Sequence, residues 1–346
     1  MRITSLIILP ICLVTGQYTE GCNGHEELCS RTYNNVSYAC THNAYSYPPP
    51  HTLPVLNQEK NITQQLQDGI RAFMLDIVRN KPVAAAAAEN PSSLQGIWNT
   101  VTSWFSPQSN SEDPIESIHL CHESCLLIDK GPLIETLITI REFMEANPRE
   151  IITLIIENVS GFSASQVAPS FEQSGLSSMA LSLQPDRFSN DSIHLNHYLW
   201  PTLQEMIGSN QRLVVFMDDK ADTSQVSYIL PEWDYVVEIP YANIDPVEQF
   251  PCNQDRPRDN IPRDLVVMNH FTYHRTAVAG EDIDTPLPAS KVKEQGYNTL
   301  DSLTKHWQTC QNVWHQQVMN FITLDYYDIG DGAIFQLVNQ INGISS

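Results

Sequence analysis

The sequence predicts an α/β fold in which parallel strands are buried between helices. Short apolar runs recur along the chain, and each of them ends at a polar residue. The runs lack the polar/apolar alternation of a half-exposed strand, which is typical of strands that helices cover on both faces. We expect strands at residues 36–40, 72–75, 118–120, 151–156, 213–217, 265–268 and 321–324.

A helical period separates two of these runs. After Gly131 and Pro132, apolar residues recur every three or four positions from Leu133 to Met144, and Pro148 stops the pattern. This stretch predicts a helix between the strands at 118–120 and 151–156.

The spacing of the polar strand ends matches repeated strand–helix–strand units. His42 lies 34 residues before Asp76, and His122 lies 35 residues before Glu157, each close to the length of one such unit. The 283 residues from His42 to Asp325 leave room for eight strands with insertions. We therefore predict a distorted, TIM-like β/α barrel with its chemistry at the C-terminal strand ends. The alternative, a doubly wound open sheet, would place its ligand at one switch point instead of around the whole sheet.

Composition excludes several classes of protein. The chain has 346 residues, of which 42% are hydrophobic, and a formal charge of −21 from 40 acidic and 19 basic residues. This apolar content excludes a disordered or collagen-like chain. The negative field repels phosphate backbones, so we expect no nucleic-acid partner.

The N-terminus predicts secretion. Residues 1–16 combine a basic start, a short apolar stretch and small residues near a cleavage site, as in a signal peptide. We expect residues 17–346 to form a single barrel domain, secreted and extracellular, with 81–114 as an alanine-rich insertion. Since later apolar stretches are too short for a membrane helix, we expect no transmembrane segment.

Cysteine usage fits an oxidising compartment. Eight cysteines occur, and Cys12 would leave with the signal peptide. The expected pairs are Cys22 with Cys29, Cys121 with Cys125, and Cys252 with Cys310, because the first two close short loops and the third ties two segments together. Cys40 is then the odd thiol. The alternative is a set of buried free cysteines.

Two histidines stand just beyond predicted strand ends. His42 follows the first strand and His122 the third. A pair of imidazoles can divide one reaction, with one removing a proton from an attacking hydroxyl and the other donating to a leaving oxygen. Asp325 and Asp218 are candidates to orient these rings. A surface or satisfied core histidine is the alternative for each.

Three oxygen ligands follow separate strands. Asn43, Asp76 and Glu157 offer the hard donors that Ca²⁺ or Mg²⁺ prefers. A bound dication would also overcome the repulsion between an acidic protein and a phosphodiester. The alternative is that Asp76 and Glu157 are structural hydrogen-bonding residues.

At these residues the chain resembles the catalytic X domain of phosphatidylinositol-specific phospholipase C, particularly the secreted members that contain only this domain. The resemblance extends from about Asn23 to about Gly332. The matching segments are Thr41–Tyr45, Gly69–Asp76, Leu120–Cys125 with Asp129 and Gly131, Asn147–Glu150 running into Ile155–Asn158, and Leu324–Asp328.

The resemblance implies a distorted TIM barrel that cleaves the glycerol-side phosphodiester bond and releases diacylglycerol and an inositol cyclic phosphate. His42 matches the first catalytic histidine, and His122 matches the one that protonates the leaving oxygen. Asn43, Asp76 and Glu157 match the ligands of the metal-dependent members. Met74 departs from the pattern, because calcium-dependent members have a glutamate there. Asp76 argues against the metal-independent variant, which has an arginine at this position.

Three functions fit these residues. The first is a secreted phosphoric diester hydrolase, of the phospholipase C type, that acts on phosphatidylinositol or a related glycolipid. The second is the same barrel acting on another head group, such as a glycerophosphodiester or a sphingolipid. The third, which Met74 favours, is a catalytically inactive secreted barrel that acts as a binding protein. As an enzyme, we expect a monomer that contacts its phospholipid substrate transiently at a membrane surface.

Overall fold

The structure is a computed structural model that describes most of the chain after residue 20. The described residues are 21–48, 56–80, 115–121, 125, 128–184, 187, 198–259, 261–278 and 281–344. The predicted signal peptide (1–16), the predicted insertion (81–114) and His122 lie outside them.

A curled parallel sheet forms the centre of the fold. Its strands are β1 (Tyr38–Thr41), β2 (Ala72–Arg79), β5 (Ile152–Glu157), β6 (Leu213–Met217), β7 (Ile229–Pro231), β8 (Val236–Glu238), β9 (Leu265–Asn269) and β12 (Phe321–Leu324). They pair in the order β7-β6-β5-β2-β1-β12-β9-β8, and each pairing along this path is parallel. The chain is therefore a distorted TIM-like β/α barrel, as predicted.

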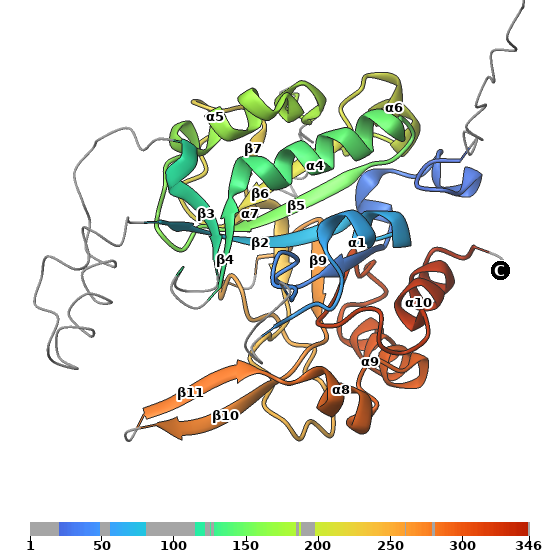
Figure 1. Ribbon diagram of the computed structural model, residues 1–346. Coiled ribbons are helices and arrows are strands. Elements are labelled where there is room, and N and C mark those ends of the chain that lie inside the picture. The colour runs from blue at the N-terminus through green and yellow to red at the C-terminus, as the bar shows by residue number, and fades with distance from the viewer. Residues whose placement is uncertain are drawn as a thin grey trace, which may run out of the picture.

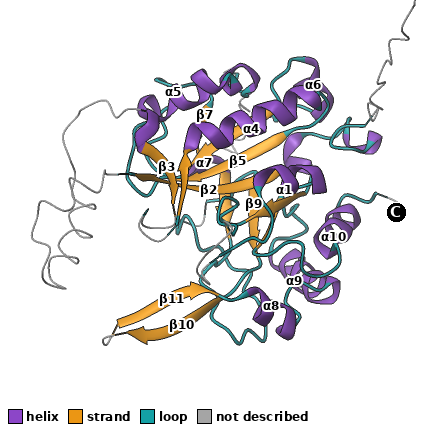
Figure 2. Ribbon diagram, in the orientation of Figure 1, coloured by secondary structure: helices purple, strands orange, loops and turns teal. Residues whose placement is uncertain are grey.

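Helices cover the outside of this sheet (Figures 1 and 2). They are α1 (Ile62–Asp68), α4 (Leu133–Ala146), α5 (Ala164–Ser174), α6 (Leu203–Gly208), α7 (Glu232–Tyr235), α8 (Ala289–Gln295), α9 (Leu300–Val313) and α10 (Ala333–Ile341). Short 3₁₀ turns occupy Glu26–Leu28, Tyr33–Asn35, Ile115–Ser117 and Leu176–Met179. The helix predicted after Pro132 is confirmed as α4. Local sequence explains other starts, since Asn61, Ser163 and Thr202 form capping boxes at α1, α5 and α6.

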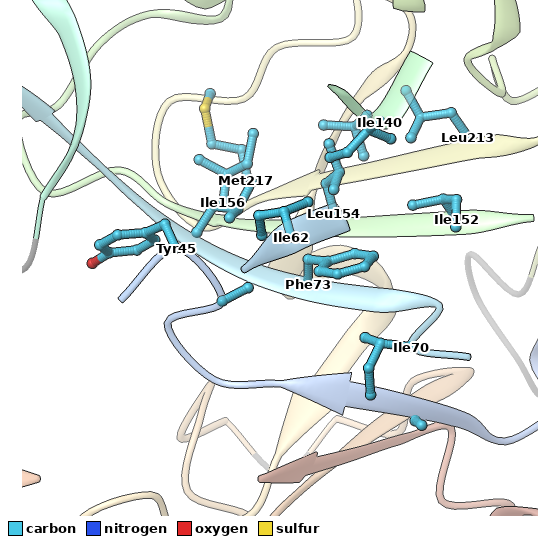
Figure 3. Packing of buried hydrophobic residues seen from close by; sticks show 14 of the residues in the cluster. Tyr45, Ile62, Ile70, Phe73, Ile140, Ile152, Leu154, Ile156, Leu213 and Met217 are labelled. Atoms are coloured by element: carbon cyan, nitrogen blue, oxygen red, sulfur yellow. The ribbon is translucent and has the colours of Figure 1, made fainter. Parts of the chain in front are cut away.

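Strand side chains alternate between two apolar regions. On the outer face, Phe73 and Leu154 pack with Ile140 of α4 in one buried cluster (Figure 3). On the inner face, Met74 and Ile155 belong to a second buried apolar cluster, inside the barrel. Because successive strand residues point to opposite faces, each inner residue predicts another inner residue two positions later.

The strand predicted at 118–120 is present, but the prediction that it belongs to the parallel barrel is wrong. β3 (Ile118–Cys121) is not a parallel barrel strand, because it pairs antiparallel with the upper part of β2 and with β4 (Asp129–Pro132). The barrel neighbour of β2 is β5. Sequence periodicity misses this arrangement because an apolar run of three residues does not show the direction of its partner.

Two further strands form a separate ribbon. β10 (Tyr273–Val278) and β11 (Glu281–Pro286) pair antiparallel and project from the barrel, at the lower left of Figure 1. Arg275 pairs with Asp284 across the ribbon. Tyr273 and Asp284 also line the main cavity.

The cysteine prediction is confirmed. The structure contains the disulfides Cys22–Cys29, Cys121–Cys125 and Cys252–Cys310, and Cys40 is a buried free thiol. Burial raises the pKa of the Cys40 thiol to about 12. Within the described part of the chain, no helix has the length and apolar character needed to cross a membrane.

The two ends of the strand order meet at a seam between β7 and β8. Among the described residues no hydrogen-bonded ladder joins these strands, although only the short helix α7 separates them in sequence. The free edge of β8 instead pairs with Arg256, whose backbone oxygen accepts from the Glu238 N–H at 2.8 Å. The Arg256 guanidinium also donates to Glu238 Oε2 through Nε, at 2.9 Å, and through Nη2, at 2.5 Å.

We expect Arg256→Met to lower the free energy of unfolding by about 3 kcal/mol, because it leaves the Glu238 carboxylate buried without its cation. Urea unfolding monitored by circular dichroism measures this loss. The control is Arg258→Met, which removes an exposed guanidinium and should cost under about 0.5 kcal/mol. Equal losses in the two variants would contradict a structural role for the seam pair.

Candidate active site

A layer of polar side chains lies at the C-terminal ends of the barrel strands. Each strand supplies one member, and most members lie two positions beyond an inner apolar residue, so they share the inner face. This polar layer consists of His42, Asp76, Glu157, Asp218, Glu232, Glu238, Asn269 and Asp325. All of them except Asp325 line one cavity of about 550 Å³.

His42 is held at the edge of the cavity by Asp325. Its backbone N–H donates to Leu324 O at 3.0 Å, which extends the β1–β12 ladder by one step. The His42 Nδ1 atom lies 2.8 Å from Asp325 Oδ1. A carboxylate at this distance accepts a hydrogen bond from Nδ1–H, so the proton stays on Nδ1 and the free lone pair is on Nε2.

An aromatic side chain fixes the plane of the His42 ring. Phe271, two residues after β9, stacks on it with 3.9 Å between ring centroids and 5° between ring planes. Tyr273 meets the same imidazole edge-on, with 6.3 Å between centroids. The ring is therefore held by Asp325 after β12 and by Phe271 and Tyr273 of the β9–β10 segment.

The three predicted oxygen ligands lie on the wall of the same cavity. Asp76 and Glu157 are direct neighbours in the parallel register of β2 and β5. Asn43 follows His42 in a turn with a φ of 44°, a left-handed conformation that asparagine tolerates better than most residues. Tyr45 donates from its hydroxyl to Asp76 Oδ2 at 2.8 Å, which fixes that carboxylate.

Desolvation and neighbouring charges raise the pKa values of three carboxyl groups around the cavity. Glu157 is open to the cavity but closely surrounded by protein atoms, and this desolvation, followed by the charge of Asp76, raises its pKa above the usual value. Arg256 opposes this shift. Burial also raises the pKa of Asp218 and, together with the charge of Glu238, that of Glu232.

Residues at the seam form another part of the cavity wall. Arg256 lies 4.4 Å from the centroid of the Tyr241 ring and 5.5 Å from that of Trp233, and all three line the cavity. Glu232 is 2% exposed, and its Oε1 atom has no hydrogen-bond partner among the described residues. This wall therefore offers a guanidinium, aromatic faces and a buried carboxyl oxygen.

The donor chemistry fits a hard divalent cation. Asn43, Asp76 and Glu157 present only oxygen ligands, as Ca²⁺ and Mg²⁺ require. Among the described residues, the cavity lining is rich in carboxylates and includes one arginine, Arg256. A dication would offset the charge of Asp76, which adds to the desolvation that raises the pKa of Glu157. Met74 lines the cavity beside them and supplies no oxygen.

The structure brings five of the six predicted site residues to one region. His42, Asn43, Asp76 and Glu157 line the cavity, and Asp325 contacts His42. His122 lies outside the described residues. Its predicted role, like the roles of the other five, stays a prediction. Asp218 accepts from the backbone N–H of Asn158 at 2.8 Å, and the histidine contact suggested for it stays a prediction.

Sequence reasoning missed the seam. Glu232 comes directly after β7, and Glu238 is the last residue of β8. Each of these strands spans three residues. The polar-ending pattern is therefore present in the sequence but too short to stand out. Arg256 and Trp233 lie outside the strands and carry no periodic signal.

Comparisons with known proteins place this geometry in a family. The family described as PI-PLC X 1 matches residues 92–342, more than half of the chain. This match begins after His42, Asn43 and Asp76, whose place in the site therefore comes from the geometry above.

Two curated relatives come from Arthroderma benhamiae. An "Uncharacterized secreted protein" is 28% identical over 335 residues, which is 94% of this chain and 65% of the relative. A "PI-PLC X domain-containing protein 1" is 28% identical over 330 residues, which is 93% of this chain and 90% of the relative. This chain thus spans slightly less than two thirds of the first protein and most of the second.

Among solved structures, the phosphatidylinositol-specific phospholipase C from Listeria monocytogenes resembles this chain with a TM-score of 0.48 and 12% identity. The likeness covers 89% of this chain and 97% of that one. From the family match over residues 92–342, we conclude that the chain belongs to the PI-PLC X family.

Proposed function

We propose that this chain is a phosphodiesterase that cleaves the glycerol-side phosphodiester bond of a phosphatidylinositol-type lipid. The observation that carries the proposal is the His42 ring, fixed by Asp325 and Phe271 at a cavity lined by oxygen donors. Family membership supports this reaction class. The cavity volume lies within the range of small-molecule sites, so it suits a lipid head group.

His42 acts as the general base in this proposal. While its Nδ1–H group donates a hydrogen bond to Asp325, its Nε2 lone pair removes the proton of the inositol 2-hydroxyl. The hydroxyl oxygen forms a bond to phosphorus as the bond from phosphorus to the glycerol oxygen breaks. The products are an inositol cyclic phosphate and diacylglycerol, and His122 supplies the proton that the leaving oxygen requires.

Asn43, Asp76 and Glu157 would hold a Ca²⁺ or Mg²⁺ ion. When bound, such an ion supplies positive charge to a phosphate oxygen and favours ionisation of the attacking hydroxyl. Tyr45 keeps Asp76 in place through its hydrogen bond. Arg256, with Trp233 and Tyr241, forms the wall that would contact the polyol ring.

Secretion is part of the proposal. The three disulfides suit an oxidising compartment, and a relative that covers most of this chain carries the name "Uncharacterized secreted protein". A secreted enzyme of this kind would meet its substrate at a membrane surface.

We expect His42→Ala and Asp325→Asn to lower the rate of cyclic inositol phosphate release by about a hundredfold to ten-thousandfold, because the base or its tautomer is lost. Phosphorus NMR of phosphatidylinositol micelles follows the product. The control is His315→Ala, which changes an exposed histidine and should leave the rate unchanged. A folded wild-type protein without activity, with either metal and on any of the head groups considered above, would favour a binding protein instead.

The predicted acid role of His122 has its own test. We expect His122→Ala to lose most of its activity on phosphatidylinositol, but much less on an inositol phosphate with a nitrophenol leaving group, because that group departs without a proton. Absorbance of the released nitrophenol gives the second rate. Equal losses on both substrates would contradict the assignment.

We expect the affinity for Ca²⁺ to rise from about pH 6 to about pH 8. The raised pKa keeps part of Glu157 protonated near neutral pH, so the ion must displace that proton, and a higher pH removes the competition. Calorimetric titration in buffers of different ionisation enthalpy measures both affinity and proton release. Glu157→Gln should abolish binding, whereas Asp284→Asn, at the cavity rim and paired with Arg275, should not. An affinity independent of pH would contradict Glu157 as a ligand.

A further inference from the structure

We propose that Asn57 is a positioning residue that fixes the tautomer of His42 by holding the Asp325 carboxylate. This inference rests on the proposed function, because it concerns how the catalytic base is prepared. Asn57 lies before α1, far in sequence from Asp325, and lies outside every motif identified in the sequence.

Asn57 contacts both members of the pair. Its Nδ2 atom lies 3.0 Å from Asp325 Oδ1 and 3.3 Å from His42 Nδ1. Asp325 Oδ1 therefore receives two N–H groups, one from the imidazole and one from the amide. The other oxygen, Asp325 Oδ2, is buried and has no partner among the described residues. The orientation of this carboxylate thus depends on two donors that meet at one oxygen.

The chemistry decides how the amide is oriented. With Nδ2 toward Asp325, a neutral donor faces a charged acceptor. The reverse orientation would set the amide oxygen against the carboxylate oxygen. At 3.3 Å, Asn57 could instead donate to a bare His42 Nδ1, but that arrangement would deprive Asp325 of its histidine donor. The charged acceptor at 2.8 Å therefore keeps the proton on Nδ1.

The backbone of Asn57 is anchored to both strands that carry the pair. Its N–H donates to Ser46 O at 3.0 Å, in the loop after β1, and its carbonyl accepts from the Tyr326 N–H at 2.7 Å, just after β12. The residue is 1% exposed. A side chain with so little freedom can fix the rotation of Asp325, and Phe271 then fixes the plane of the imidazole.

Gln58 provides a matched control. It is the next residue, it is fully buried, and its amide also donates to the same two strand ends. However, Gln58 Nε2 donates to the backbone oxygens of His42 and Leu324, at 2.7 and 3.0 Å, and not to the catalytic side chains. Gln58→Leu therefore removes a comparable buried amide while it leaves the Asp325 side chain with both donors.

The test is the tautomer of His42, read from imidazole nitrogen-15 chemical shifts at a pH where the ring is neutral. His42→Gln identifies the signal. The wild type should carry its proton on Nδ1, and so should Gln58→Leu. In Asn57→Leu the Nδ1–H form should give way to a mixture of tautomers. Because this measurement needs no substrate, it decides on Asn57 even if the chain fails as a phosphodiesterase.

Kinetics provide the second readout on the lipid substrate. Asn57→Leu should lower kcat about tenfold or more and leave KM nearly unchanged, since Asn57 acts through the base and not on the head group. Asn57→Asp keeps the shape but replaces the donor with an acceptor, so it should disturb the tautomer at least as much and serves if Asn57→Leu does not fold. A wild-type ring protonated on Nε2, an unchanged tautomer in both Asn57 variants, or an equal change in Gln58→Leu would overturn the proposal.

Discussion

The parallel pairing of β1 with β12 is the contact on which the candidate site depends. It joins the first and last strands of the barrel and sets Thr41 beside Leu324. The next residue on each strand is then His42 and Asp325, which are 283 positions apart in sequence. Neither side chain could reach the other without this register. Two backbone hydrogen bonds, from Asn57 N–H to Ser46 O and from Tyr326 N–H to Asn57 O, link the loops that follow these strands and reinforce the pairing.

The alternation of side chains along each strand explains why the site is a layer. A barrel core is filled by inward side chains, and its apolar part ends at Met74, Ile155 and their neighbours. The next inward position on each strand meets the cavity, where polar side chains such as Asp76 and Glu238 find hydrogen-bond partners that offset the cost of burial. Carboxylates gather there from strands distant in sequence, and desolvation, followed by the charge of Asp76, raises the pKa of Glu157.

Much of this arrangement could be predicted from the sequence, and the exceptions have physical reasons. Long apolar runs such as β5, β6 and β12 were visible because burial on both faces leaves a continuous signal. The position of Asp76 beside Glu157 follows from strand order, which periodicity does not encode. β7 and β8 were too short to detect, and the direction of β3 depends on its hairpin with β4.

Side chains that act from loops were the least predictable. Asn57 and Arg256 reach the site because distant backbone segments hold their loops, and nothing near them in sequence records those contacts. Disulfides that close short loops were easier to predict, because two cysteines as near in sequence as Cys121 and Cys125 leave each thiol few other partners. Apart from the Cys252–Cys310 pair, prediction thus succeeded where a pattern is local and failed where an interaction joins remote loops.

Because no ladder joins β7 to β8 in the part of the chain that the structure describes, the barrel is open at this seam. A fully hydrogen-bonded cylinder has a bore fixed by its strand number and stagger, so it cannot widen without breaking a ladder. Among the described residues, the edge of β8 pairs instead with the backbone of Asp255 and Arg256. This gap in the ladder gives a loop residue, Arg256, a place in the cavity wall.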